Sequence, residues 1–233
     1  MSIADNLIKI KSRIDSALKQ AQRKDSVRLV AVSKAQTIGR IEQAFLAGQR
    51  DFAENYLQEA LQKIQALKSF PIEWHYIGNV QSNKTRQIAA NFTWVHSVCD
   101  ERIAHRLNAF RLDDLLPLNV CVQINLQPGS ARLGVPSTRI EDFLLIFAEL
   151  KNLRLRGLMV FPDLIADAEQ QEKIFLLAHK TFQRLQLQYS DMDTLSMGTS
   201  SDLESAIICG SNLVRVGTAI FGARQAGPME LVK

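Results

Sequence analysis

The sequence has 233 residues, of which 46% are hydrophobic and 22% charged, as expected for a globular protein with one sizeable core. The net charge of +4 comes from 28 Lys and Arg against 24 Asp and Glu, and the basic residues form no run of the kind that binds nucleic acid. The three cysteines are far apart, odd in number and without a CxxC pair, which argues against a disulfide framework and a zinc site. The four histidines show no ligand spacing with carboxylates, so no metal site is predicted.

The N-terminal segment mixes charged and apolar residues at helical spacing and has no continuous apolar stretch, so it does not resemble a secretion signal. No run of 18 apolar residues occurs, which argues against a membrane span. We therefore expect a cytoplasmic protein without a membrane partner.

From its first residues the chain alternates amphipathic segments with short apolar ones. Residues 3–22 carry apolar side chains three or four apart, which predicts a helix that packs on the rest of the fold within about residues 1–24. The apolar run 27–33, which ends just before Lys34, predicts the first strand. A second helix is predicted over residues 38–48.

The same alternation continues to the end of the chain. The further predicted strands cover residues 51–54, 73–78, 93–98, 118–125, 153–161, 194–197 and 213–217. The further predicted helices cover residues 56–68, 82–91, 100–111, 136–150, 167–187 and 201–209. The count is eight strands, seven of them followed by helices, with one additional helix in front.

Strands that alternate with helices pair in parallel, because each helix returns the chain to the same edge of the sheet. Eight such units in about 230 residues are typical of a closed barrel. The alternative is an open doubly wound sheet, whose first turn is usually rich in glycine. Here the first turn, residues 33–36, reads Ser-Lys-Ala-Gln. We therefore predict an α/β fold, a single (β/α)8 TIM barrel with an additional N-terminal helix, in which residues 1–233 form one domain.

Active sites of such barrels lie at the C-terminal ends of the strands, a rule that selects Lys34 after the first strand. Lys34 ends an otherwise apolar segment, where partial desolvation disfavours the ammonium and leaves more neutral amine to attack a carbonyl carbon. The alternative is a lysine whose stem lies along the rim of the barrel while its charge stays in water. From this residue alone, the alternative is the better interpretation.

The ends of the last two predicted strands carry glycine and hydroxyl side chains. Segment 195–202 reads Leu-Ser-Met-Gly-Thr-Ser-Ser-Asp, and segment 215–218 reads Arg-Val-Gly-Thr. Backbone N–H groups and hydroxyls in such turns bind phosphate, and barrels often use the loops after strands seven and eight for this purpose. The alternative is that Ser200 or Ser201 caps the next helix and that Gly217 merely ends a strand. The paired occurrence of the two turns favours phosphate.

Two further polar features are less specific. His75 lies between Trp74 and Tyr76, and a packed, hydrogen-bonded histidine is more frequent in such a strand than a catalytic one. The polar segment 81–86 opens a helix and either faces a ligand or partner or forms a solvated first turn.

Seven motifs in order along the chain resemble one family. They read Ala-Val-Ser-Lys at 31–34, Asp-Phe-Ala-Glu-Asn-Tyr at 51–56, Trp-His-Tyr-Ile-Gly at 74–78, Gln-Ser-Asn-Lys at 81–84, Arg-Gly-Leu-Met at 156–159, Leu-Ser-Met-Gly at 195–198 and Arg-Val-Gly-Thr-Ala-Ile-Phe-Gly at 215–222. Over about residues 5–224 the sequence resembles the pyridoxal phosphate homeostasis proteins, the proline synthase co-transcribed group. The resemblance implies the fold of the N-terminal barrel of alanine racemase.

The resemblance also implies a site for pyridoxal 5′-phosphate (PLP). Lys34 matches the lysine that forms a Schiff base with PLP, and Arg215 matches the arginine that faces the pyridine nitrogen. Ser200, Gly217 and Thr218 match the residues that hold the phosphate. The other matched positions, which line the cofactor pocket, are Asn55, Met197 at its strand end and His75.

Two departures from the family pattern fall near this site. Thr199 stands where the family usually has a methionine in the phosphate turn, and Arg132 stands where the family commonly has a lysine after the fifth strand. A guanidinium cannot act as an amine that exchanges with the Schiff base. The presence of Arg132 therefore argues against a second lysine that helps to move the cofactor in this protein.

The implied environment of PLP limits its chemistry. A pyridine nitrogen that faces Arg215 stays unprotonated, because a guanidinium does not give up its proton, and the ring is then a weaker electron sink. Racemisation also needs a second acid or base, which in alanine racemases is a tyrosine from another domain, and we expect no such domain because the sequence ends at Lys233.

We therefore expect a PLP-binding protein of PLP homeostasis and delivery rather than an enzyme. It is expected to act as a monomer, with PLP-dependent enzymes in their apo form as recipients of the cofactor. Two alternatives stay open. One is a weak PLP-dependent amino-acid racemase, and the other is a lyase that uses Lys34 directly, without a cofactor.

Overall fold

The computed structural model describes residues 2–127, 129–163 and 167–222. Its strands are β1 (Arg28–Val32), β2 (Asp51–Glu54), β3 (Glu73–Tyr76), β4 (Trp94–Val98), β5 (Leu118–Asn125), β6 (Val135–Pro136), β7 (Leu153–Val160), β8 (Thr194–Ser196) and β9 (Leu213–Val216). Its α-helices are α1 (Ile3–Gln20), α2 (Ile38–Leu46), α3 (Leu57–Ala66), α4 (Thr85–Asn91), α5 (Glu101–Phe110), α6 (Ile140–Leu144), α7 (Ala168–Gln186), α8 (Leu203–Ile208) and α9 (Thr218–Phe221).

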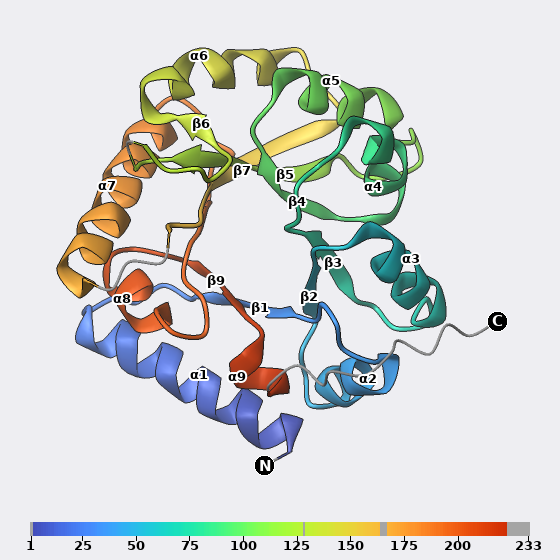
Figure 1. Cartoon of the computed structure of the whole chain (residues 1–233), viewed down its shortest axis with the longest axis vertical. Helices are drawn as coiled ribbons and strands as arrows, with labels where there is room; N and C mark the ends of the chain where they lie inside the picture. Colours follow the sequence, from blue (N-terminus) through green and yellow to red (C-terminus); the bar gives the residue numbers. More distant parts are fainter. Residues whose placement is uncertain (1, 128, 164–166, 223–233) are drawn as a thin grey trace.

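The eight longer strands close into a parallel barrel. The order is β1-β2-β3-β4-β5-β7-β8-β9, and β9 pairs again with β1. Figure 1 shows these strands as a central ring with the helices outside it. The predicted TIM barrel is confirmed, and the open doubly wound sheet is excluded because β4 and β5 pair and leave no gap in the ring.

Most predicted helices and strands are present with ends that differ by a few residues. The predicted helix over 136–150 is less regular, since α6 lies between two 3-10 turns, Ser137–Arg139 and Leu145–Ala148. Two short elements were not predicted. These are β6, which pairs with the last two residues of β5, and α9, which follows β9.

The strands are almost wholly buried because the barrel interior covers one face and the helices cover the other. Val30 and Val32 pack with Ala53 in the interior, whereas Leu29 and Ala31 pack in the outer layer that includes the helices. Side chains alternate between these two layers along each strand. Residue parity therefore indicates which side chains face the barrel axis.

Helix α1 begins at a capping box in which Ser2 and Asp5 each accept a hydrogen bond from the other's backbone N–H. Its buried apolar stripe packs beside α8, α9 and α2 (Figure 1). The helix therefore lies across the segment where the chain enters and leaves the barrel. That residues 1–233 form a single domain stays a prediction.

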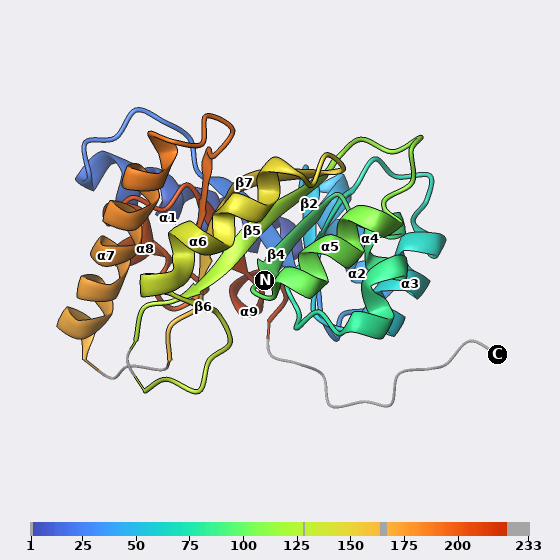
Figure 2. The same ribbon diagram turned by 90° about the horizontal axis from the view of Figure 1, so that it is seen from above.

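The short unpredicted elements mark one end of the barrel. Helix α9 follows the last strand and β6 pairs with the C-terminal end of β5, and Figure 2 shows both at the same end. The loops that follow the strands gather at this C-terminal end. Within the described residues, no helix has both the length and the apolar character needed to cross a lipid bilayer.

Candidate functional site

Lys34 lies in the turn that follows β1, at the C-terminal end of the barrel, and the alternation of β1, if continued, would direct its side chain inward. The N–H of Ser33 still donates to Ala53 in β2, so the ladder continues for one residue past β1. Lys34 follows with the parity of Val30 and Val32, and it is partly buried. Ala35 then adopts a left-handed backbone with φ of +57°, and its N–H donates to Glu59 Oε1 at 2.7 Å. The backbone around Lys34 is therefore held by contacts on both sides.

A buried ionic group, which we call the Lys63 cluster (Lys63, Glu54 and Glu59), supports this turn from outside the barrel. Lys63 Nζ donates to the carbonyl oxygen of Ser33 at 2.7 Å, to Glu54 Oε1 at 2.7 Å, and to Glu59 Oε1. Glu54 also accepts from the Ser33 hydroxyl at 2.6 Å. Burial raises the pKa of Glu54, although Lys63 and Ser33 oppose that shift. The Lys63 cluster thus binds the residues on both sides of Lys34.

Asn55 follows β2 at the same end of the barrel, and its buried side-chain oxygen has no hydrogen-bond partner among the described residues. The next strand approaches it closely at Gly78. A methyl group at Gly78 would lie 2.1 Å from the carbonyl oxygen of Asn55, a separation that no real side chain shows. Glycine is therefore required for the two loops to lie together.

The loops after β8 and β9 meet, as the paired motifs indicated. Ser200 Oγ accepts a hydrogen bond from the N–H of Ala219 at 3.4 Å. Gly217 lies against β1, where an added methyl group would be 3.2 Å from the carbonyl oxygen of Val32. Thr218 is exposed and begins α9.

The alternative role for the serines, as caps of the next helix, is not what the structure shows. The residue before α8 is Asp202, which accepts from both the N–H and the hydroxyl of Thr199. Thr199, the departure from the family motif, therefore has a local partner of its own. Ser200 is left to face the loop after β9.

Helix α1 also holds this loop, which the sequence pattern did not indicate. Arg13 pairs with both carboxylate oxygens of Glu204, and it donates to the carbonyl oxygen of Ser200 at 3.1 Å. Asn6 donates to the carbonyl oxygen of Ile220 in α9 at 2.9 Å. The N-terminal helix therefore fixes both loops that the sequence predicts to bind phosphate.

Arg215 lies inside the barrel, one level below these loops. In the β1–β9 register it is opposite Val30. Its guanidinium donates to the carbonyl and hydroxyl oxygens of Ser196 at 2.8 and 2.6 Å and to the carbonyl oxygen of Val160 at 3.0 Å. Burial lowers the pKa of Arg215 to about 10, which still leaves it charged near neutral pH. Among the described residues no carboxylate forms an ion pair with it, although the charge of Asp202 partly opposes the lowering of its pKa.

Two residues predicted to line the pocket, Met197 and His75, have side chains away from the C-terminal end of the barrel interior. The side chain of Met197 belongs to the outer layer of the core, so only its backbone is available to a ligand in the barrel. His75 is fully buried in the interior, and its two ring nitrogens contact Asp51 and His96. It reaches Arg215 only through other side chains.

Arg132 lies beside the same end of the barrel. It pairs with Asp163 at 3.0 Å, and its guanidinium carbon is 4.6 Å from the centre of the Phe161 ring. The guanidinium carbon of Arg215 is 5.9 Å from the same ring centre. Phe161 therefore lies between an interior cation and one at the surface.

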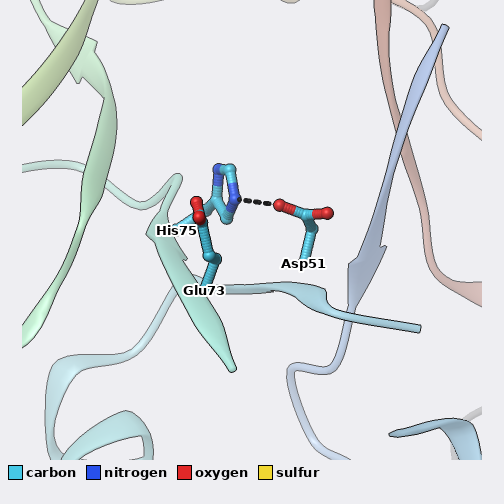
Figure 3. Close-up of side chains that lie close together, drawn as sticks. All are labelled: Asp51, Glu73 and His75. Atoms are coloured by element: carbon cyan, nitrogen blue, oxygen red, sulfur yellow. Dashed lines mark hydrogen bonds and ion pairs between the residues drawn. The ribbon is translucent and has the colours of Figure 1, made fainter. Parts of the chain in front are cut away.

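At the opposite end of the barrel, Asp51, Glu73 and His75 bring potential metal-ligand atoms within 4.8 Å of one another (Figure 3). Sequence spacing missed this group because the β2–β3 register places Asp51 opposite Glu73. A cation already lies among these residues, since the guanidinium of Arg28 pairs with both carboxylates. The group is therefore an internal ion-pair network.

The structure thus places Lys34, Asn55, Ser200, Gly217 and Thr218 at the C-terminal end of the barrel. Arg215 lies beneath this end. These are the positions at which barrels of this kind bind their ligands.

Comparison with known proteins identifies the family. The family model of the alanine racemase N-terminal domain matches residues 6–225. The pyridoxal phosphate homeostasis protein of Pasteurella multocida is 44% identical, over 96% of this chain and 98% of its own length. That of Pseudomonas aeruginosa is 45% identical, over 97% of each chain. PipY of Synechococcus elongatus, solved with PLP bound, is 34% identical with a TM-score of 0.84, over 95% of this chain and 100% of its own.

More distant structures agree in fold alone. Alanine racemase from Bacillus anthracis is 21% identical with a TM-score of 0.68, over 98% of this chain and 56% of its own. The chain therefore belongs to the alanine racemase N-terminal domain family and, within it, to the pyridoxal phosphate homeostasis proteins.

Proposed function

We propose that this protein binds PLP, holds it as a Schiff base on Lys34, and serves PLP homeostasis and delivery with little or no turnover of amino acids. The names of its relatives and the PLP-bound structure of PipY support PLP binding and a place in PLP homeostasis. Within the chain itself, the supporting observation is Arg215, a buried cation beneath Lys34 with no carboxylate partner among the described residues. Its guanidinium donates only to neutral oxygens, so a ligand atom that accepts from it would help to offset the cost of burying the charge.

The residues at the C-terminal end of the barrel fit PLP in kind. The unpaired buried oxygen of Asn55 offers an acceptor, and Gly217 keeps the backbone beside β1 free of side-chain atoms. The loops of Ser200 and Thr218 offer hydroxyl and backbone N–H groups of the type that binds phosphate. By the family resemblance, these loops would hold the phosphate and Arg215 would face the ring nitrogen.

When bound, PLP supplies an aldehyde carbon and an electron-withdrawing ring. Lys34 would hold PLP through its side-chain amine, which in its neutral form can condense with an aldehyde and release water. Lys34 is partly buried where it follows β1. The Lys63 cluster holds the backbone on both sides of the attacking group.

Low turnover is part of the proposal because of Arg215. A guanidinium donates hydrogen bonds but does not protonate a pyridine nitrogen near neutral pH, even with its pKa lowered to about 10. An unprotonated ring withdraws electrons less strongly from a carbon bound at the C=N group. The residues around Lys34 therefore suit retention of PLP better than carbanion chemistry.

The test is the absorption spectrum of the purified protein after addition of PLP. Borohydride reduction followed by peptide mass analysis should locate one reduced pyridoxyl phosphate group on Lys34. Lys34→Ala should abolish the band, whereas Lys151→Ala, an exposed lysine at the opposite end of the barrel, should keep it. Modification of another lysine at equal yield in the Lys34→Ala protein would contradict the assignment.

Two further measurements test the remaining parts. Ser200→Ala or Thr218→Ala should weaken PLP retention on gel filtration more than it changes the melting temperature, and unchanged occupancy in both would count against the phosphate assignment. Chiral analysis after incubation with L- or D-alanine should show no sustained interconversion. Sustained interconversion would favour the racemase alternative.

A further inference from the structure

A continuous line of buried polar side chains crosses the barrel interior from Arg215 to the N-terminal end. Arg215 NH1 lies 2.6 Å from Ser196 Oγ, and Ser196 Oγ lies 3.0 Å from His96 Nδ1. His96 Nε2 lies 2.9 Å from His75 Nδ1, and His75 Nε2 lies 3.1 Å from Asp51 Oδ1. The five side chains come from β9, β8, β4, β3 and β2, and we call them the interior chain.

The donors and acceptors of this interior chain can be assigned from its two ends. Asp51 is a carboxylate and only accepts, so His75 carries its proton on Nε2 and its Nδ1 is an acceptor. His96 must then donate from Nε2, which leaves its Nδ1 to accept from the Ser196 hydroxyl. Ser196 can still accept from Arg215, which only donates. When both imidazoles are neutral, this single arrangement satisfies every contact, with all donors pointing toward Asp51.

The surroundings favour two neutral imidazoles. Burial lowers the pKa of His75 against the pull of Asp51 and nearby Glu73, and Arg28 lowers it further. Burial also lowers the pKa of His96 well below its usual value, and the positive charges of Arg215 and Arg28 act in the same direction.

Packing restrains the rings as well. His75 stacks on Trp94 with ring centres 5.4 Å apart and planes 11° from parallel. The rings therefore have little freedom to turn and exchange their nitrogens.

We propose that Ser196, His96 and His75 are positioning residues that hold the guanidinium of Arg215 in place by linking it, through one fixed set of tautomers, to Asp51. Asp51 is the fixed acceptor at the far end, because Arg28 also pairs with it. Successive hydrogen bonds in one direction polarise each other, so Ser196 accepts more strongly from Arg215. The tautomers follow from the structure alone, whereas the effect on PLP rests on the proposed function.

The first experiment uses the full-length, PLP-free protein and requires no ligand. Long-range ¹H–¹⁵N correlation spectra of ¹⁵N-labelled protein report which imidazole nitrogen carries the proton. Signals are assigned by their loss in His75→Gln and His96→Gln. Both rings should be neutral and protonated on Nε2 from pH 6 to pH 8. A ring protonated on Nδ1, or charged at pH 7, would overturn the proposal.

The second experiment breaks the link to Arg215. In Ser196→Ala, the His96 Nδ1 resonance should move toward that of an unbonded nitrogen while both rings keep their tautomers. Release of PLP should become at least about ten-fold faster, the factor that one charge-assisted hydrogen bond of ~1.4 kcal/mol supplies. Ser196→Thr, which keeps the hydroxyl, should restore slow release.

Ser97→Ala is the matched control, because it also removes a buried hydroxyl with one hydrogen bond, to Gly78, but lies outside the interior chain. Its release rate should stay within about two-fold of the wild-type protein. The positioning role would be refuted if Ser196→Ala released PLP at the wild-type rate, or if its His96 Nδ1 resonance did not move. If the wild-type protein fails to bind PLP at all, the proposed function fails, and the tautomer and resonance measurements still decide the interior chain.

Discussion

Replacement of Lys63 by methionine tests how strongly the Lys63 cluster holds the turn at Lys34. Methionine has nearly the same length but no charge, so the change leaves Glu54 and Glu59 buried without their cation. The variant loses contacts to Ser33, Glu54 and Glu59, of which the first two are both 2.7 Å long. Breaking a buried ion pair by removing one partner costs about 3–5 kcal/mol. We expect the free energy of unfolding to fall by that amount near pH 8.

The loss should depend on pH because Glu54 can be protonated. Burial already raises the pKa of Glu54, and removal of Lys63 removes the main opposing influence. Below its pKa the carboxyl is neutral and needs no cation. We therefore expect a smaller loss at pH 5 than at pH 8, and Lys63→Met combined with Glu54→Gln should recover part of the stability at pH 8.

Urea unfolding followed by circular dichroism measures both effects, provided that the transition is two-state. Lys68→Met is the control, since Lys68 is exposed just after α3 and should change stability by less than about 0.5 kcal/mol. A loss below about 1 kcal/mol for Lys63→Met at pH 8, or equal losses at both pH values, would refute this account of the cluster.

The interior histidines and the loop glycines give two more expectations. Burial lowers the pKa of His75 and His96 in the folded barrel. Below pH 6.5, about the usual pKa of histidine, the two imidazoles therefore bind protons in the unfolded chain but not in the folded one. The free energy of unfolding should then fall on acidification by up to ~1.4 kcal/mol per pH unit for each imidazole. Urea midpoints between pH 7 and pH 5 should show a shallower fall in the His75→Gln/His96→Gln variant, and an equal fall would contradict neutral buried rings. Gly78→Ala should lower the free energy of unfolding by about 1–3 kcal/mol, because the added methyl group overlaps Asn55. Gly39→Ala is the control, since no atom lies within 4 Å of the added methyl group there. Equal melting temperatures for the two variants would argue against the close approach at Gly78.

Local pattern was sufficient to predict much of the architecture. The eight longer strands are runs of three to eight residues that are rich in buried side chains, and the helices between them carry their buried side chains at helical spacing. The element β6 was missed because two residues show no periodicity. The irregularity of residues 136–150 was missed because a 3-10 turn has nearly the same apolar spacing as an α-helix.

The candidate site was predictable where one rule sufficed. Barrels bind ligands at the C-terminal ends of their strands, and the order of strands and helices in the sequence is enough for this rule to select Lys34 and the loop of Gly217. Met197 was assigned to the pocket by its place in a motif. Side-chain alternation would have warned against this, since Ser196 faces the interior and its neighbours must face outward.

By itself, the sequence determined the alternation of strands and helices, and therefore a parallel α/β fold, because burial pattern is a local property of the chain. It also placed Lys34 at a strand end. Only the tertiary structure decided what surrounds that lysine. Lys63 reaches the turn from α3, Arg13 reaches the Ser200 loop from α1, and the interior chain joins five strands. These contacts depend on strand register and barrel closure, which bring together residues up to about two hundred positions apart and leave no periodic signal in sequence.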